Sequence, residues 1–288
     1  MVGRPNGTNV ITGPTGFSFR GGGTIHVHSR IDMAGNGLGR DDSGTVVLFC
    51  PSNSYGDTTC VQGTVQLGVA NGWCTNAQMS LGKANTSGHS AFNLDGFDQT
   101  LCGLREVSTT YAGPNNTRIV STPADKPATL TLDQRSDTVW GSSYGFSYIR
   151  GPLSLVKKGA KSFTLDGTNA FTGTTTVEAG LLKASVLGAL GGTTNVVVKG
   201  GTLQLGASKA LNEQADVRFP AGSTGRLQLD AGVEQVVQYL FVDDKDVPCA
   251  PGTYGSSQSV AAHKDDTRFA GTGVLTVRRG GGFVILFR

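Results

Sequence analysis

The sequence predicts an all-β protein folded as a right-handed parallel β-helix, a type of β-solenoid. Three observations favour this fold: a composition poor in helix formers, many short segments of alternating polarity, and an internal repeat. Glycine accounts for 43 of the 288 residues, roughly twice its usual share of about 7%. Charged residues make up only 16% of the chain, so long amphipathic helices are not expected.

Short strands are predicted along the whole chain because apolar and polar residues alternate in many short segments. The clearest segments are TIHVH (24–28), GTVVLF (44–49), GTVQLGV (63–69), ATLTLD (128–133), NVVVKGGTLQLG (195–206), GRLQLD (225–230) and GVLTV (273–277). Gly, Asn, Asp, Ser or Pro bounds nearly all of them, as expected for strands joined by turns. By themselves, such strands fit a sandwich, a barrel or a solenoid equally well.

An internal repeat favours the solenoid. Residues 43–68 align with residues 160–185: in both, a strand ends in Leu, an Asn turn and an aromatic residue follow, and a Thr-rich strand leads to a glycine. Residues 195–206 and 269–277 carry fainter copies. In a solenoid, inward positions are apolar and the corners favour Gly and Asn. We therefore expect one β-helix domain over residues 1–279, with roughly a dozen coils of about 20 to 25 residues each.

Residues 155–185 (LVKKGAKSFTLDGTNAFTGTTTVEAGLLKAS) resemble the autotransporter-associated β-strand repeat, or passenger-associated transport repeat, of secreted bacterial surface proteins. The matching positions are Val156, Lys157, Gly159, Leu165, Asn169, Phe171, Gly173, Thr174, Thr175, Val177, Gly180 and Leu182. Residues 93–104 resemble the segment that often follows this repeat, and residues 241–255 with 269–277 resemble the closing segment of these proteins. The resemblance implies an exported parallel β-helix at, or released from, the cell surface. It implies much less about activity.

The export route is not evident from the residues. No run approaches the ~20 apolar residues of a membrane-spanning helix, and no signal peptide is visible at the start. Autotransporters end in a barrel of about a dozen strands, whereas eleven residues follow Val277 here. We expect either another route or an excised passenger. Residues 280–288 are expected to add a strand to the end of the solenoid, or to form a tail that pairs with another chain.

Charge and cysteine content exclude several classes of protein. The net charge of +3 is small and scattered, so a nucleic-acid partner is not expected. The five cysteines contain no CxxC pair, which argues against zinc-ribbon and thioredoxin-like proteins. Cys50 and Cys60 flank a predicted turn and are candidates for a disulfide in an oxidising compartment. Unbridged, partly buried thiols are the alternative.

Two sets of residues are candidate metal ligands. His26 and His28 lie two apart in a predicted strand, so both imidazoles face one side, although no third ligand is indicated. A solvated pair is the alternative. The acidic pairs are candidates for Ca²⁺ binding or for acid/base work on a glycan, with carboxylates that cap turns as the alternative; they are Asp41–Asp42, Asp243–Asp244 and Asp265–Asp266. No cofactor is otherwise expected.

Aromatic residues indicate a candidate ligand-binding face. Tyr144, Phe146 and Tyr148 alternate along YGFSY (144–148) and therefore share one face, where their rings can stack on sugars. Packing into the core is the alternative. The overlapping GSSYG (141–145) matches the nucleophile-elbow pattern, but no helical period follows it, so we expect a turn there and no catalytic residues.

These observations predict a non-enzymatic extracellular or cell-surface protein with a structural or adhesive role. Its expected partner is a glycan or another cell-surface component. One alternative is a carbohydrate-binding or polysaccharide-degrading β-helix, which needs acids and aromatics gathered in a cleft. Another is a self-assembling fibre subunit that associates through the ends of the solenoid.

Overall fold

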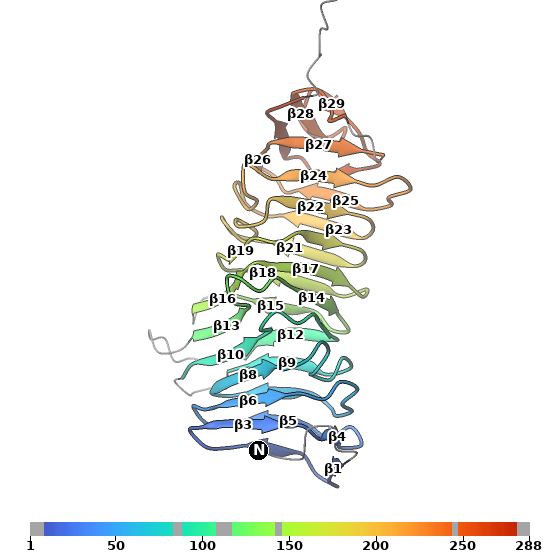
Figure 1. Ribbon diagram of the computed structural model, residues 1–288. Helices are drawn as coiled ribbons and strands as arrows, with labels where there is room; N and C mark the ends of the chain where they lie inside the picture. Colours follow the sequence, from blue (N-terminus) through green and yellow to red (C-terminus); the bar gives the residue numbers. More distant parts are fainter. Residues whose placement is uncertain (1–8, 83–87, 108–116, 142–145, 244–246, 281–288) are drawn as a thin grey trace, which may run out of the picture.

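The computed structural model describes residues 9–82, 88–107, 117–141, 146–243 and 247–280. Within these residues the chain consists of strands and connecting turns without a helix, and successive strands stack into a tall parallel β-solenoid (Figure 1). This confirms the predicted fold class. All seven of the clearest predicted segments contain a strand.

The strands form three faces that the chain visits in turn. The first face is a seven-stranded sheet of β3 (Thr24–Val27), β6 (Thr45–Leu48), β8 (Gly63–Leu67), β10 (Ser90–Asn93), β13 (Thr117–Ser121), β16 (Phe146–Gly151) and β19 (Ala170–Phe171). The second face contains β1 (Val10–Thr12) paired with β4 (Arg30–Asp32), and a seven-stranded sheet of β11 (Gln99–Leu101), β14 (Ala128–Asp133), β17 (Leu153–Lys158), β20 (Thr175–Val177), β22 (Asn195–Val198), β24 (Asp216–Phe219) and β27 (Tyr239–Val242).

The third face is built from two sheets that meet where β12 contacts β15. The sheet nearer the N-terminus contains β2 (Phe17–Phe19), β5 (Leu38–Arg40), β7 (Thr58–Cys60), β9 (Gln78–Leu81) and β12 (Gly103–Glu106). The other contains β15 (Thr138–Trp140), β18 (Ser162–Leu165), β21 (Leu181–Ala184), β23 (Thr202–Leu205), β25 (Arg226–Leu229) and β30 (Phe269–Ala270). All strand pairs within the three faces are parallel, so each face grows by one strand per turn.

The solenoid has about nine turns, fewer than the dozen predicted. The prediction assumed a uniform repeat length, which holds for the shortest turns: Phe17 pairs with Leu38 on the next turn. Other turns carry long loops, and Leu227 pairs with Phe269. Stacking fixes the distance between strands but leaves the corner loops free to lengthen at small entropic cost. The same number of residues therefore makes fewer turns.

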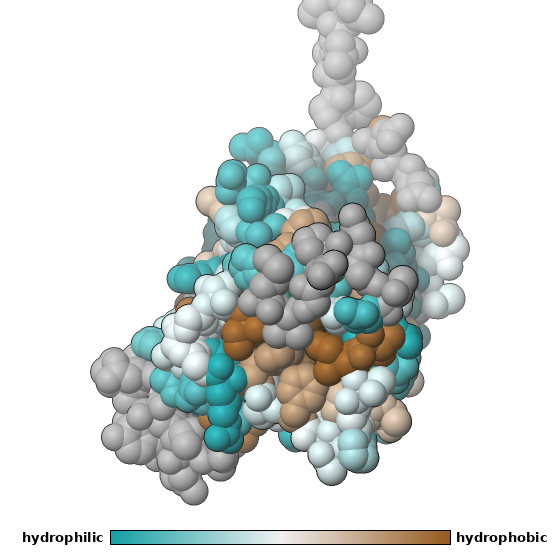
Figure 2. Space-filling model, turned by 60° about the horizontal axis from the view of Figure 1, so that its bottom comes forward, coloured by the Kyte–Doolittle hydropathy of each residue, from teal (hydrophilic) through white to brown (hydrophobic). Residues whose placement is uncertain are grey.

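The two ends of the solenoid differ. At the C-terminal end β26 (Glu234–Val237) pairs in parallel with β31 (Val274–Val277), but β28 (Gly252–Gly255) runs antiparallel to β31 and pairs with β29 (His263–Lys264). β28 therefore covers an edge that a further parallel strand would use. Figure 2 shows apolar side chains gathered at the opposite end, where Ile11, Phe17 and Ile25 are only partly buried. Association through the ends stays a prediction.

A single apolar core runs along the axis because inward positions repeat in register from turn to turn. On the third face, Phe163, Leu182, Leu203, Leu227 and Phe269 occupy the same inward position on successive strands, and each is at most 2% exposed. Burying each such side chain contributes about 1.5–3 kcal/mol, so the ladder is a main source of stability.

Asparagine side chains hold the corners together. The Oδ1 atom of Asn169 accepts a hydrogen bond from the Ile149 N–H (2.8 Å), and its amide donates to the carbonyls of Gly167 (3.0 Å) and Ala189 (2.9 Å). Asn169 thereby links the turn before it to the turn after it. Asn53, its partner in the repeat alignment, makes an equivalent set of three bonds. However, Asn53 follows the first face and Asn169 follows the third, so the two copies occupy different corners.

Buried cations satisfy other corner carbonyls. Lys157 is 0% exposed, and its Nζ donates to the carbonyls of Lys158 (2.6 Å), Gly159 (2.9 Å) and Ala179 (3.1 Å). Arg40, also fully buried, donates to three backbone carbonyls in the same way. Burial lowers the pKa of Lys157 to about 8. Both side chains therefore belong to the architecture of the solenoid.

We expect Asn169→Ala to lower the free energy of unfolding by about 3 kcal/mol, because two buried backbone groups and one partly buried carbonyl lose their partner. Urea denaturation measures the change. Asn76→Ala is the matched control: Asn76 is exposed and its Oδ1 accepts a hydrogen bond from Arg135, so its loss should cost no more than about 0.5 kcal/mol. Equal losses for the two variants would contradict the role assigned to the corner amide.

Lys157 also predicts a dependence of stability on pH. Its pKa is about 8 in the folded state and roughly 10.5 in an unfolded chain, so the unfolded state binds the proton more tightly. Its contribution to the free energy of unfolding should therefore rise as the pH increases from about 8 to 10.5. The difference in stability between wild type and Lys157→Met, measured at pH 7 and pH 10, should grow in favour of wild type. A constant difference would refute this assignment.

Candidate functional site

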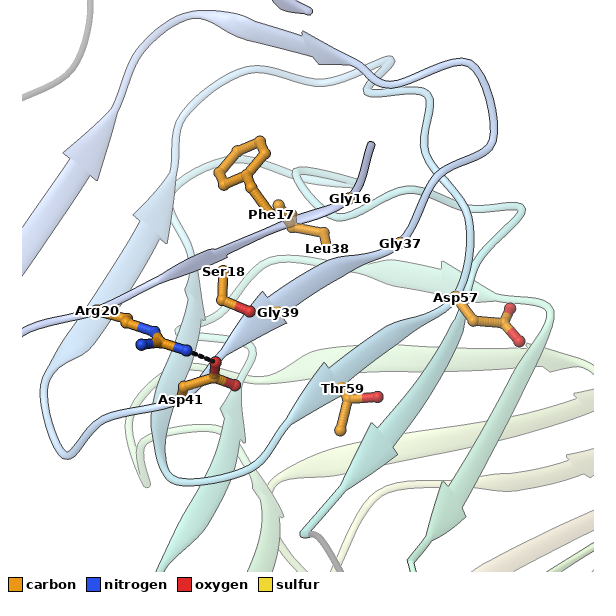
Figure 3. A pocket seen from close by; sticks show the side chains of 10 residues that line it. All are labelled: Gly16, Phe17, Ser18, Arg20, Gly37, Leu38, Gly39, Asp41, Asp57 and Thr59. Atoms are coloured by element: carbon orange, nitrogen blue, oxygen red, sulfur yellow. Dashed lines mark hydrogen bonds and ion pairs between the residues drawn. The ribbon is translucent and has the colours of Figure 1, made fainter. Parts of the chain in front are cut away.

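A groove of about 550 Å³ lies on the outside of the third face, near the N-terminal end (Figure 3). Its walls come from three successive strands, β2, β5 and β7, and from the residues that flank them. The lining residues are Gly16, Phe17, Ser18, Arg20, Gly37, Leu38, Gly39, Asp41, Asp57 and Thr59. Because the groove is built on stacked strands, hydrogen bonds between the turns hold its shape.

Glycine makes the floor of the groove hollow. Ser18, Gly39 and Thr59 pair in register and occupy the outward position of their strands. A Cβ atom on Gly39 would lie only 2.1 Å from the Oγ of Ser18, so a side chain here would displace that hydroxyl and fill the groove. Next to it, a Cβ on Gly37 would lie 2.8 Å from the carbonyl oxygen of Asp57. The turns approach closely at this place because neither position carries a side chain.

Charged groups stand at both ends of the groove. At one end, Nη2 of Arg20 lies 3.2 Å from Oδ2 of Asp41, as the dashed line in Figure 3 shows. At the other end is the exposed Asp57, whose Oδ1 accepts a hydrogen bond from the N–H of Gln78 (3.1 Å). Two carboxylates and a guanidinium therefore border the hydroxyl groups on the floor.

The polar row continues beyond the groove. Thr59 pairs with Ser80 on the next turn, and Ser80 pairs with Arg105 on the turn after that. The Nε of Arg105 donates to the Oγ of Ser80 (2.9 Å); Ser80 is buried and Arg105 is exposed, so Arg105 is the group that a ligand could reach there. Hydroxyls donate and accept, carboxylates accept, and guanidinium groups donate. Such an arrangement can form hydrogen bonds with an extended ligand rich in hydroxyl groups.

A second, smaller groove of about 310 Å³ lies on the outside of the first face. It is lined by Thr64, Ala91, Asn93, Ile119, Ser121, Thr122, Pro123 and Arg150. Of the predicted aromatic face, only Tyr148 can be placed: it is half-buried beside this groove, in register with Ile119. Tyr144 and the side chain of Phe146 lie outside the described residues, as does most of GSSYG. Stacking of sugars on this face stays a prediction.

His26 and His28 both lie on the outside of the first face, with ring centroids 6.4 Å apart. Phe49 packs against both: its ring stacks on His28 at 4.5 Å and lies 5.4 Å from His26. An aromatic ring therefore occupies the space beside the pair. In the part of the chain that the structure describes, no group of three or more metal-ligating side chains occurs. Metal binding by the pair stays a prediction.

The predicted acidic pairs do not act as units. Asp41 lines the groove, whereas Asp42 accepts a hydrogen bond from the Gly21 N–H (2.8 Å). Asp243 and Asp265 both pair with Arg268, at 2.6 Å and 3.0 Å. Asp266 accepts from the N–H of Ser257 (2.7 Å), and Asp244 lies outside the described residues. Asp42 and Asp266 accept hydrogen bonds from backbone N–H groups, whereas Asp41, Asp243 and Asp265 pair with arginine. Binding of Ca²⁺ stays a prediction.

The disulfide considered for Cys50 and Cys60 is not formed, and all five cysteines are unbridged. Cys60 points into the core from β7 and is 0% exposed, whereas Cys50 follows β6 and is half-buried. Burial raises the pKa of the Cys60 thiol to about 12, which keeps it protonated and unreactive. The alternative of unbridged thiols is what the structure shows.

The fold defines a parallel β-solenoid built from imperfect repeats. A family model described as the passenger-associated-transport-repeat matches residues 155–184, so the repeat predicted for residues 155–185 is confirmed. This family belongs to autotransporter passengers. The comparisons with curated proteins and with solved structures give no match. Among the described residues, no helix has the length and hydropathy required to span a bilayer.

The matched repeat and the groove are separate parts of the molecule. Lys157, Asn169 and Phe171, which belong to the repeat motif, are all buried. The residues of the motif therefore hold successive turns together, and they do not indicate which ligand the protein binds. Sequence reasoning missed the groove, although one signal was present: Gly39 and its neighbours interrupt the alternation where an outward side chain is expected.

Arg20→Ala should leave the fold intact. The Arg20 side chain is 74% exposed, and exposed ion pairs contribute about 0.2–1 kcal/mol at most. We expect its free energy of unfolding to change by less than about 0.5 kcal/mol. Leu38→Ala removes a buried side chain from β5, one of the strands that form the groove, and should lower the free energy of unfolding by about 2–5 kcal/mol. Urea denaturation compares the two, and a large loss in Arg20→Ala would show that the ion pair holds the turns together.

Proposed function

We propose that this protein is a non-enzymatic β-solenoid that is exported and either stays at the cell surface or is released from it. It serves there as a rigid adhesive scaffold that binds a glycan. The match of residues 155–184 to a repeat of autotransporter passengers supports the location. The groove on the third face carries the proposal of glycan binding, because hydroxyl, carboxylate and guanidinium groups line one hollow.

The construction of the groove suits a polymer of sugars. Neighbouring strands lie about 4.8 Å apart, and Gly39 lies between Ser18 and Thr59, so the two residues present hydroxyls roughly 10 Å from each other. Each sugar unit offers several hydroxyls that Asp41 and Asp57 can accept from. β5 and β7 are bonded to a strand on each side and β2 is bonded to β5, so the backbone of the groove loses little conformational freedom when the ligand binds.

Polysaccharide degradation is the second candidate. Asp41 and Asp57 border the same hollow, and glycosidases use two carboxylates as acid and base or nucleophile. Oδ2 of Asp41 already lies 3.2 Å from the guanidinium of Arg20, so this carboxylate is engaged in an ion pair, and binding is the better supported of the two candidates. A degrading enzyme would release new reducing ends from a polysaccharide, whereas a binding protein would not.

The test is a glycan-array screen combined with assays for reducing-end release from plant and algal polysaccharides. We expect binding without release. Gly39→Val should weaken binding at least about tenfold, because its side chain fills the groove. Gly23→Val is the matched control, since a Cβ at Gly23 meets no atom within 4 Å. Release of product that Asp57→Asn abolishes would establish the enzyme instead. No binding and no release would refute a glycan ligand.

A further inference from the structure

A separate cavity of about 420 Å³ lies in the C-terminal cap, at the opposite end of the stack from the groove (Figure 1). Its walls come from β27, β28, β29, β30 and the loop after β27. The antiparallel course of β28 is what separates the cap from the regular stack at this place. The lining residues are Leu240, Val242, Val247, Pro248, Cys249, Tyr254, His263, Lys264, Asp265 and Phe269.

Rings and aliphatic side chains dominate the walls. The ring of Tyr254 stacks on His263 with centroids 4.5 Å apart, and it lies 6.4 Å from the ring of Phe269. The hydroxyl of Tyr254 donates to the carbonyl of Ala250 (2.8 Å), so its polar end is already satisfied. Val247 on the rim is 65% exposed, a high value for an aliphatic side chain. The cavity thus presents apolar surface to solvent.

The charged groups of the lining already have partners within the protein. Asp265 forms an ion pair with Arg268 (3.0 Å) and accepts a hydrogen bond from the N–H of Thr267 (2.9 Å). Lys264 donates to the carbonyl of Ser259. A charged ligand would have to break these bonds or be buried without a partner, which is costly. A neutral ligand meets no such penalty.

We propose that this cavity binds a small, uncharged aromatic molecule of two fused rings. An apolar cavity of about 150 Å³ is enough for benzene, and typical ligand sites measure about 300–1,000 Å³. The volume of the cap cavity, about 420 Å³, is more than twice that needed for one ring and therefore accommodates two fused rings. Stacking on the Tyr254–His263 pair and contact with Phe269 supply the attraction.

Cys249 provides a direct reporter. It lines the cavity and is half-buried, whereas the half-buried Cys50 lies at the other end of the molecule. With 2-naphthol as probe, we expect the rate of alkylation by N-ethylmaleimide to fall about fivefold or more at Cys249 and to stay unchanged at Cys50. Peptide mass spectrometry measures both rates in one sample. Equal protection at the two thiols, or none at Cys249, would overturn the proposal.

Matched variants and probes locate the site. Saturation-transfer NMR should give an affinity for 2-naphthol that Val247→Arg weakens about tenfold or more. Val260→Arg, at a 92% exposed valine outside the cavity, should have no effect. 2-Naphthoate and cellobiose should bind at least about tenfold more weakly than 2-naphthol. Equal losses in both variants, or stronger binding of the anion or the sugar, would refute an uncharged aromatic ligand. Neither outcome bears on the groove of the third face.

Discussion

The structure depends on satisfying backbone groups at the corners of each turn. Within the three faces, parallel strands bond to the strands above and below, but the chain must leave one face and enter the next with its carbonyls partly turned inward. Asn169 and Lys157 meet this need with three bonds each. A polar side chain inside an apolar core is tolerated here because its polar atoms are hydrogen-bonded to backbone groups at the corners.

The same constraint explains why the repeat says little about ligands. Several residues of the motif, such as Lys157, Asn169 and Phe171, are buried and serve the stacking, so they carry information about the fold. The outward positions are free of that requirement and can vary from turn to turn. The groove is an example of such variation, because Gly39 leaves a hollow between Ser18 and Thr59. The hydrogen-bonded strands fix the positions of the hydroxyl and carboxylate groups around it.

The C-terminal cap illustrates a second consequence of parallel stacking. A regular stack leaves an open edge at its end, and β28 covers part of it by reversing direction against β31. Reversal breaks the regular packing, so apolar side chains such as Val247 and Tyr254 line a cavity instead of a continuous core. The cap therefore provides both an end to the stack and a site of different chemistry from the groove.

The sequence by itself determined the fold class, because alternation along short segments and the repeat at residues 155–185 depend only on local order. It also aligned Asn53 with Asn169, whose side chains make similar sets of three hydrogen bonds at different corners. The number of turns, the groove around Gly39 and the separation of Cys50 from Cys60 were decided by tertiary structure. Loop lengths set which residues lie above one another, and Asp41 and Asp57 come to share a hollow only through that register. Contacts between turns cannot be inferred from the local pattern. A loop can gain a residue without any change in the sequence of the strands it connects, so the strand sequences do not reveal which residues of neighbouring turns lie side by side.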